Sequence, residues 1–198
     1  MGDEYLLKEY ELSFEQLRFY DTRQENLLKY LCTLTSAVAT ALLALFQLTH
    51  GATAYFLQLA ALVAGLVFIA SLLLFLAMLQ NRLYFVYVAR QINAIRAHLM
   101  DVSADGFKKN QMYTSTRFPA LKLMSTHTLQ ISGAALISSL FAGGCAYGLA
   151  APGRCGLALF IAVEVFVAAF IIEAACGVAY LLVQGKKSAD SAIHSESK

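Results

Sequence analysis

Four long apolar runs constrain this chain more than any other feature of its sequence. They cover Tyr30–Thr49, Ala52–Leu79, Thr128–Ala151 and Leu157–Val183. A helix rises about 1.5 Å per residue, so about 20 residues cross the roughly 30 Å of hydrocarbon in a bilayer. Each run reaches that length, and none alternates like a membrane β-strand. The sequence therefore predicts an all-α membrane protein with four transmembrane helices.

The distribution of positive charge predicts the topology. Segment 80–127 holds seven of the 15 Lys and Arg residues, residues 1–29 hold four, and segment 184–198 holds three. The two short connections near residues 50 and 153 hold only Arg154 between them. Lys and Arg are retained on the cytoplasmic side of membrane proteins. We therefore expect both termini and segment 80–127 in the cytoplasm.

Five segments follow from this pattern. We expect a cytoplasmic N-terminal helix continuous with helix 1, transmembrane helices 1 and 2, a basic cytoplasmic helical extension and loop, transmembrane helices 3 and 4, and a disordered tail. These segments are 1–29, 30–79, 80–127, 128–183 and 184–198.

Helices 1 and 2 are expected to extend beyond the membrane into the cytoplasm. No Gly or Pro occurs between Ser13 and Gly51, and none occurs between residues 82 and 100. Ser13 and Gln16 have the spacing of a capping box, which predicts that the first helix begins near Phe14. Residues 82–100 are amphipathic at 100° per residue, with one apolar and one basic face.

The cytoplasmic segment is a candidate site for an anionic ligand. After Asp101, basic residues alternate with aromatic ones, a composition typical of phosphate-binding or single-strand-binding surfaces. The same composition suits contact with lipid headgroups, and a solvated basic face that anchors the topology is the simpler alternative. The candidate ligand-binding residues are Arg82, Arg90, Asn93, Arg96, Lys108, Lys109, Arg117 and Lys122.

The third apolar run is rich in small residues and predicts close helix packing. Gly144 and Gly148 form a GxxxG spacing, which lets helix backbones approach closely in lipid. The partner helix can belong to the same subunit or to another one.

Two carboxylates interrupt the fourth run, and a carboxyl in a membrane helix marks a candidate functional site. Glu164 and Glu173 are nine residues apart, which places them about 180° apart around the helix and about 13.5 Å apart along it. They cannot share a proton as a catalytic pair. Three interpretations remain: neutral acids that accept hydrogen bonds from hydroxyls on neighbouring helices, carboxylates that line a cation pathway, or a proton relay in a carrier. The candidate hydroxyl residues are Ser132, Ser138 and Ser139, or Thr35, Ser36 and Thr40.

Catalytic and metal-binding signatures are missing from the sequence. It holds no HExxH, G-x-S-x-G, P-loop or GxGxxG motif, and its four His residues lack metal-ligand spacing. We expect neither enzyme activity nor a cofactor or bound metal. Cys145 and Cys155 approach the outer face, where either free thiols or a disulfide are possible.

Two stretches resemble a known family. KEYELSFEQLRFYDTRQENLLKYL, which runs into the first membrane helix, and ARQINAIRAHLM, in the extended second helix, are similar to the SLATT-like pore-forming membrane effectors of bacterial anti-phage operons. Within that group the four-helix plan is most similar to the membrane subunit of the Hailong system. The resemblance implies a homo-oligomeric channel in the bacterial inner membrane, controlled by the nucleotide or oligonucleotide product of a partner nucleotidyltransferase.

The sequence thus favours an oligomeric, cytoplasmically gated ion channel that acts as a defence effector. A non-conducting membrane scaffold that recruits a cytoplasmic partner is an alternative. A small proton-coupled carrier is another, although neither an internal repeat nor a broken membrane helix is visible.

Overall fold

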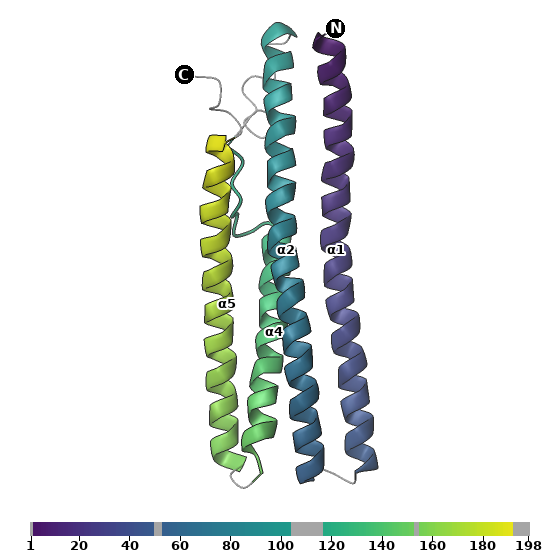
Figure 1. Ribbon diagram of the computed structural model, residues 1–198, viewed down its shortest axis with the longest axis vertical. Coiled ribbons are helices and arrows are strands. Elements are labelled where there is room, and N and C mark those ends of the chain that lie inside the picture. Colours follow the sequence, from purple (N-terminus) through teal and green to yellow (C-terminus); the bar gives the residue numbers. More distant parts are fainter. Residues whose placement is uncertain (1, 50–52, 104–116, 153–154, 192–198) are drawn as a thin grey trace. The chain divides into compact units, whose positions relative to one another are not determined.

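The protein is all-helical in its described part. A computed structural model describes residues 2–49, 53–103, 117–152 and 155–191. These residues form four helices, each long and apolar enough to cross a membrane. The helices are α1 (Gly2–Leu48), α2 (Ala54–Ser103), α4 (Thr126–Ala150) and α5 (Cys155–Ser191), shown in Figure 1. The prediction of four helices from the four apolar runs is therefore confirmed.

The start of α1 differs from the prediction. The helix begins at Gly2, and Ser13 lies inside it with a side chain that is 1% exposed. Residues 3–12 contain good helix formers and neither Gly nor Pro, so the helix extends beyond the proposed cap. The capping-box interpretation of Ser13 and Gln16 is wrong, because the Ser13 side chain is buried and caps no helix start.

Two other helix starts carry hydroxyl caps. The Thr53 Oγ1 accepts a hydrogen bond of 3.1 Å from the Phe56 backbone N–H, ahead of α2. At the start of α4, the Ser125 Oγ accepts a hydrogen bond of 3.3 Å from the Thr128 backbone N–H. Each hydroxyl satisfies an amide that has no partner within its own helix.

The last helix is longer than the apolar run that predicts it. α5 continues to Ser191, eight residues beyond Val183 and into the segment expected to be disordered. Gly185 does not end the helix. It packs closely against Ala120, since a Cβ atom at Gly185 would lie 2.7 Å from the Ala120 Cβ.

The chain divides into two compact units, and helices α1, α2 and α5 contribute residues to both. Unit 1 combines residues 1–25, 79–123 and 178–198, and unit 2 combines residues 26–78 and 124–177. Unit 2 therefore contains nearly all of the four apolar runs, whereas unit 1 contains most of the charged residues.

Close glycine contacts pack unit 2. At Gly148 of α4, a Cβ atom would lie 2.7 Å from the Leu57 carbonyl oxygen of α2 and 2.9 Å from the Ala61 Cβ. The neighbouring Gly143 approaches α5 instead, where a Cβ atom would lie 2.8 Å from the Ala162 carbonyl oxygen. Helix α4 therefore contacts α2 and α5 through different glycines, and the GxxxG face of α4 packs within the chain.

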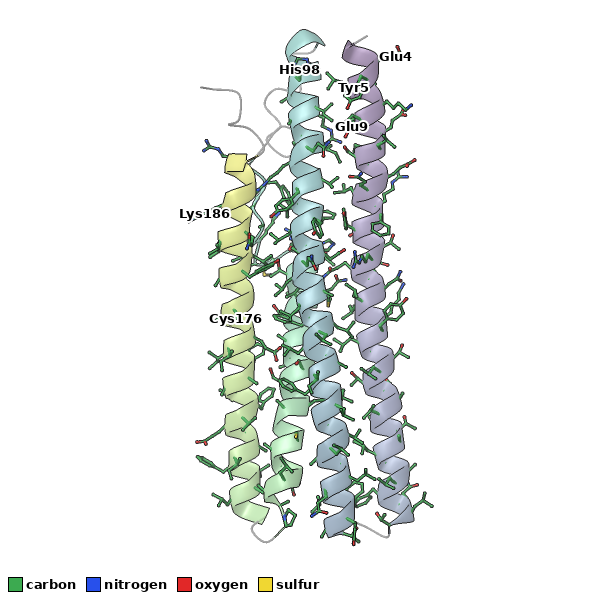
Figure 2. All side chains as sticks on the ribbon, in the orientation of Figure 1. Glu4, Tyr5, Glu9, His98, Cys176 and Lys186 are labelled. Carbon is green, nitrogen blue, oxygen red and sulfur yellow. The ribbon has the colours of Figure 1, made fainter. Side chains whose placement is uncertain are left out.

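Polar side chains join α1 to α2 in unit 1. The Asn81 Nδ2 donates to the Tyr20 carbonyl oxygen at 2.8 Å and to the Gln24 Oε1 at 2.9 Å. Nearer the start of α1, the Gln91 Nε2 donates to the Glu9 Oε1 at 2.8 Å, and Glu9 is labelled in Figure 2. Hydrogen bonds as well as apolar contacts therefore hold these two helix segments together.

Burial differs sharply among the four spans. In the most apolar 18-residue stretch, 33% of α2 and of α4 is buried, but only 11% of α5 and 6% of α1. α2 and α4 thus form the interior of unit 2, while most of the apolar part of α1 has no covering helix among the described residues.

Candidate functional site

Glu173 is buried between α5 and α4. Its side chain is 6% exposed, and the Ser138 Oγ of α4 donates a hydrogen bond of 2.9 Å to its Oε1. Ser138 is fully buried, and the second carboxyl oxygen, Oε2, has no hydrogen-bond partner among the described residues. This hydrogen bond is of the kind that the helix-bonding interpretation of the two acids describes.

Glu164 has the opposite environment on the same helix. Its side chain is exposed on unit 2, and it forms no hydrogen bond or ion pair with any residue that the structure describes. The spacing of nine residues predicts opposite faces, and the burial of the two acids agrees with that spacing. Only Glu164 therefore presents a carboxyl group at membrane depth to whatever surrounds unit 2.

The apolar part of α1 carries an exposed polar face that hydropathy does not reveal. At 100° per residue, its members fall within an arc of about 100°. All are small or polar, and all are exposed: Thr33, Ser36, Ala37, Thr40, Ala44 and Gln47. Averaged hydropathy masks this face, because Ala, Thr and Ser do not offset the Leu and Val residues beside them. The angular distribution of small residues is the signal that identifies it.

Five neighbouring residues form an open surface on and beside this polar face of α1: Cys32, Thr33, Ser36, Ala37 and Thr40. The Thr40 hydroxyl donates to the Ser36 carbonyl oxygen at 2.9 Å, whereas the hydroxyls of Thr33 and Ser36 bond to no described residue. This surface thus offers hydroxyl groups over part of the apolar length of α1.

The opposite face of α1 is apolar and partly covered. Leu34, Val38, Leu42 and Leu45 are half-buried, and Phe46 of α1 contacts Phe56 of α2 at a ring-centroid distance of 5.4 Å. α1 therefore attaches to unit 2 by its apolar face and leaves its polar face uncovered.

Two of the predicted ligand-binding arginines bond to the protein's own backbone. The Arg82 Nε donates to the Ala120 carbonyl oxygen at 3.1 Å, and Arg82 is 2% exposed. The Arg90 Nε donates to the Phe118 carbonyl oxygen at 2.9 Å, and its Nη1 donates to the Gly185 carbonyl oxygen at 2.9 Å. Both side chains hold chain segments together in unit 1.

Arg96 contacts α1, and Asn93 is buried on α2. The Arg96 Nε donates to the Tyr10 hydroxyl at 2.9 Å, and its guanidinium lies 5.5 Å from the Tyr10 ring and 5.2 Å from the Phe14 ring. Asn93 is 5% exposed. These two residues are therefore already engaged or buried within unit 1.

The remaining predicted residues divide by exposure and position. Arg117 and Lys122 are exposed and flank the segment that Arg82 and Arg90 bond. Lys108 and Lys109 lie outside the described residues. Of the eight predicted ligand-binding residues, Arg117 and Lys122 are therefore the two whose described side chains are exposed to a ligand.

The described part of the chain contains free cysteines and no candidate metal site. Cys32, Cys145 and Cys176 are free thiols, and the side chain of Cys155 lies outside the described residues. No group of three or more His, Cys, Asp or Glu residues in that part is arranged to hold a metal ion.

Comparison with family models, with curated proteins and with solved structures finds no match to this chain. Its class therefore follows from the fold itself. Its four helices, each able to cross a membrane, are those of a multi-pass α-helical membrane protein.

Proposed function

We propose that this chain is an oligomeric ion channel whose pore is lined by the polar face of α1. The observation that carries the proposal is the exposure of this face along a helix that is otherwise suited to lipid. From Thr33 to Gln47 it extends about 21 Å, which is most of the hydrocarbon thickness. Hydroxyls and small side chains facing a common axis would line a water-filled path.

Assembly of several copies explains why a single chain leaves this face uncovered. One helix cannot enclose a pore, and closed rings of identical subunits are the usual arrangement of homo-oligomers. We propose separately that Glu164, exposed on α5, also faces the path in each copy, where a ring of carboxylates would attract cations. Glu173, bonded to Ser138, belongs to the packing of the subunit itself.

We further propose that the channel lies in the bacterial inner membrane with both termini in the cytoplasm. There it acts as an effector of anti-phage defence. The basic residues of unit 1 suit an anionic cytoplasmic signal, such as a nucleotide or oligonucleotide made by a partner nucleotidyltransferase. α1 is one unbroken helix that contributes to unit 1 and also carries the polar face. A ligand that moves the first half of α1 would therefore act on the pore directly.

Cysteine accessibility tests the proposed pore. In a chain whose native cysteines are replaced by serine, Thr33→Cys, Ser36→Cys, Thr40→Cys and Ala44→Cys each place a thiol on the polar face. Leu34→Cys, Val38→Cys and Leu45→Cys are the matched controls on the apolar face. Liposomes holding each variant are exposed to a cationic methanethiosulfonate reagent, and ion flux is measured with and without candidate nucleotides.

We expect the reagent to block flux in the polar-face variants and to leave the apolar-face variants unchanged. Equal block on both faces would show that α1 does not line the path. Flux without block at any of these positions would place the pore on another helix, and absence of flux from oligomeric protein under every condition would exclude a channel.

One observation favours a second function, a scaffold that recruits a partner. Tyr5, Leu12 and Phe19 of α1 are 67%, 45% and 59% exposed, and they lie within about 40° of one another around the helix. An exposed apolar stripe of this kind suits a protein partner. If Tyr5→Gln, Leu12→Gln and Phe19→Gln together abolish cellular activity but leave ion flux intact, recruitment is part of the function.

A further inference from the structure

The acidic side chains are segregated within the described part of unit 1. The acidic side chains that the structure describes there all lie on α1. By contrast, segments 79–98, 117–123 and 178–186 contain no Asp or Glu. They contain six cations: Arg82, Arg90, Arg96, Arg117, Lys122 and Lys186. The side of unit 1 built from these segments is therefore positive, with no carboxylate among them.

Three of these segments meet at one junction. Arg82 and Arg90 of α2 bond to the carbonyl oxygens of Ala120 and Phe118, and Arg90 also bonds to that of Gly185 in α5. The Tyr87 hydroxyl adds a hydrogen bond of 3.4 Å to the Gln184 carbonyl oxygen. The junction of α2, segment 117–122 and the end of α5 is thus held by side chains of α2.

The exposed cations lie on the two segments that α2 holds in place. Arg117 and Lys122 flank residues 118–120, and Lys186 follows Gly185; all three side chains are exposed. Figure 2 labels Lys186 near the end of α5. Because a Cβ atom at Gly185 would lie 2.7 Å from that of Ala120, the backbones that carry these cations are in direct contact.

A buried charge beneath them strengthens the positive potential. The Arg82 guanidinium lies 5.5 Å from the Phe85 ring and 5.7 Å from the Phe118 ring. Its Nη2 is buried and has no hydrogen-bond partner among the described residues. A buried cation without a carboxylate partner is poorly compensated, so an anion bound nearby would lower its electrostatic energy.

We propose that Arg117, Lys122 and Lys186 form a binding site for the phosphate of an anionic phospholipid headgroup, with Arg82 and Arg90 as positioning residues. This lipid site goes beyond the proposed channel and does not depend on ion conduction. It assigns Arg117 and Lys122, two of the candidate residues for the soluble anionic signal, to a lipid headgroup instead.

Two observations favour a lipid over a soluble nucleotide. Leu123, adjacent to Lys122, is 71% exposed, and an apolar side chain next to a cation is suited to the boundary between acyl chains and headgroups. Two of the cations also lie close in sequence to the ends of apolar runs, where headgroup contacts concentrate. Lys186 follows Val183 by three residues, and Lys122 precedes Thr128 by six.

Lipid binding to the purified full-length protein tests this site. The fraction of protein carrying lipid is measured by native mass spectrometry in mild detergent, during titration with phosphatidylglycerol and separately with phosphatidylcholine. The test variant combines Arg117→Gln, Lys122→Gln and Lys186→Gln. The control combines Lys8→Gln, Arg18→Gln and Arg23→Gln, three exposed cations of α1 in the same unit.

We expect the wild type and the α1 control to prefer phosphatidylglycerol. The junction variant should bind phosphatidylglycerol roughly 10- to 100-fold more weakly, since three cations near the headgroup are lost. A charge-conserving variant, Arg117→Lys with Lys122→Arg and Lys186→Arg, should retain the preference, and circular dichroism confirms that each variant is folded.

Three outcomes would overturn the lipid site. Equal losses in both glutamine triples would mean non-specific attraction, and no loss in either would mean that the junction does not bind the headgroup. Displacement of phosphatidylglycerol from the wild type by ATP or an oligonucleotide at equal phosphate concentration would assign the junction to a soluble phosphate ligand instead. Ion flux is measured separately, so failure of the lipid site leaves the channel proposal untouched.

Discussion

At the scale of single residues, Glu164 and Glu173 show how one helix gives the same side chain two environments. Glu173 accepts a hydrogen bond from Ser138 and is buried, whereas Glu164 is exposed. The sequence spacing predicts that they face opposite ways. It does not predict which acid is covered, because the covering residue, Ser138, lies 35 residues away on α4.

Removal of the charge at Glu164 is predicted to weaken cation selectivity. In bilayers with a potassium chloride gradient, Glu164→Gln should lower the ratio of potassium to chloride permeability roughly tenfold, which corresponds to about 1.4 kcal/mol of lost attraction. The control is Glu173→Gln, whose amide oxygen can still accept the Ser138 hydrogen bond. An equal change in both variants, or an unchanged ratio in Glu164→Gln, would contradict a pore-facing Glu164.

The arginines of α2 show where residue-level prediction fails. The sequence places Arg82 and Arg90 in a candidate ligand site, yet both bond to backbone carbonyl oxygens far away in sequence. The acceptor of Arg82 is 38 residues away, and those of Arg90 are 28 and 95 residues away. Contacts of such long range depend on how the chain folds back on itself. Periodicity within a single helix carries no information about them.

At the scale of helices, the sequence predicts that each helix exists far better than it predicts where the helix begins and ends. Four apolar runs correctly predict four helices, because length and hydropathy are local properties. The start of α1 and the end of α5 both lie outside the expected limits. The polar face of α1 is visible only from its angular distribution, since the average over the run is apolar.

The packing of α4 on α2 yields a stability prediction. Gly148→Ala places a Cβ atom 2.7 Å from the Leu57 carbonyl oxygen, so the helices must separate at a cost of about 1–3 kcal/mol. Gly133→Ala is the control on the same helix, because a Cβ atom there meets nothing within 4 Å. Thermal unfolding in detergent should show a lower midpoint for Gly148→Ala and no decrease for Gly133→Ala. Equal midpoints would mean that α4 and α2 pack differently.

At the scale of the whole molecule, most apolar residues and most charged residues lie in different units. The apolar runs lie almost entirely in unit 2, and the basic segments lie in unit 1. This division is the expected one for a protein whose bulk outside the bilayer lies on one side. It supports our proposal that unit 1 is cytoplasmic, because Lys and Arg are retained on that side.

The proposed topology is testable by labelling from outside the cell. In a cysteine-free chain, Arg154→Cys and Lys198→Cys place single thiols in the short connection and at the C-terminus. A membrane-impermeant maleimide applied to intact spheroplasts should label Arg154→Cys alone, and lysis should expose Lys198→Cys. Labelling of Lys198→Cys before lysis would reverse the proposed orientation.

The continuity of α1 has a mechanical consequence. Its 47 residues include no Pro and no Gly after Gly2, and sharp kinks in helices occur almost always at Pro, Gly–Ser pairs or π-bulges. α1 therefore lacks a Pro or Gly hinge, and we expect a displacement near Tyr10 to be taken up by tilting or rotating the helix rather than by a sharp kink. In the proposed channel, a turn of this helix about its own axis would exchange hydroxyl groups for leucine side chains along the pore, so rotation alone would wet or dry it.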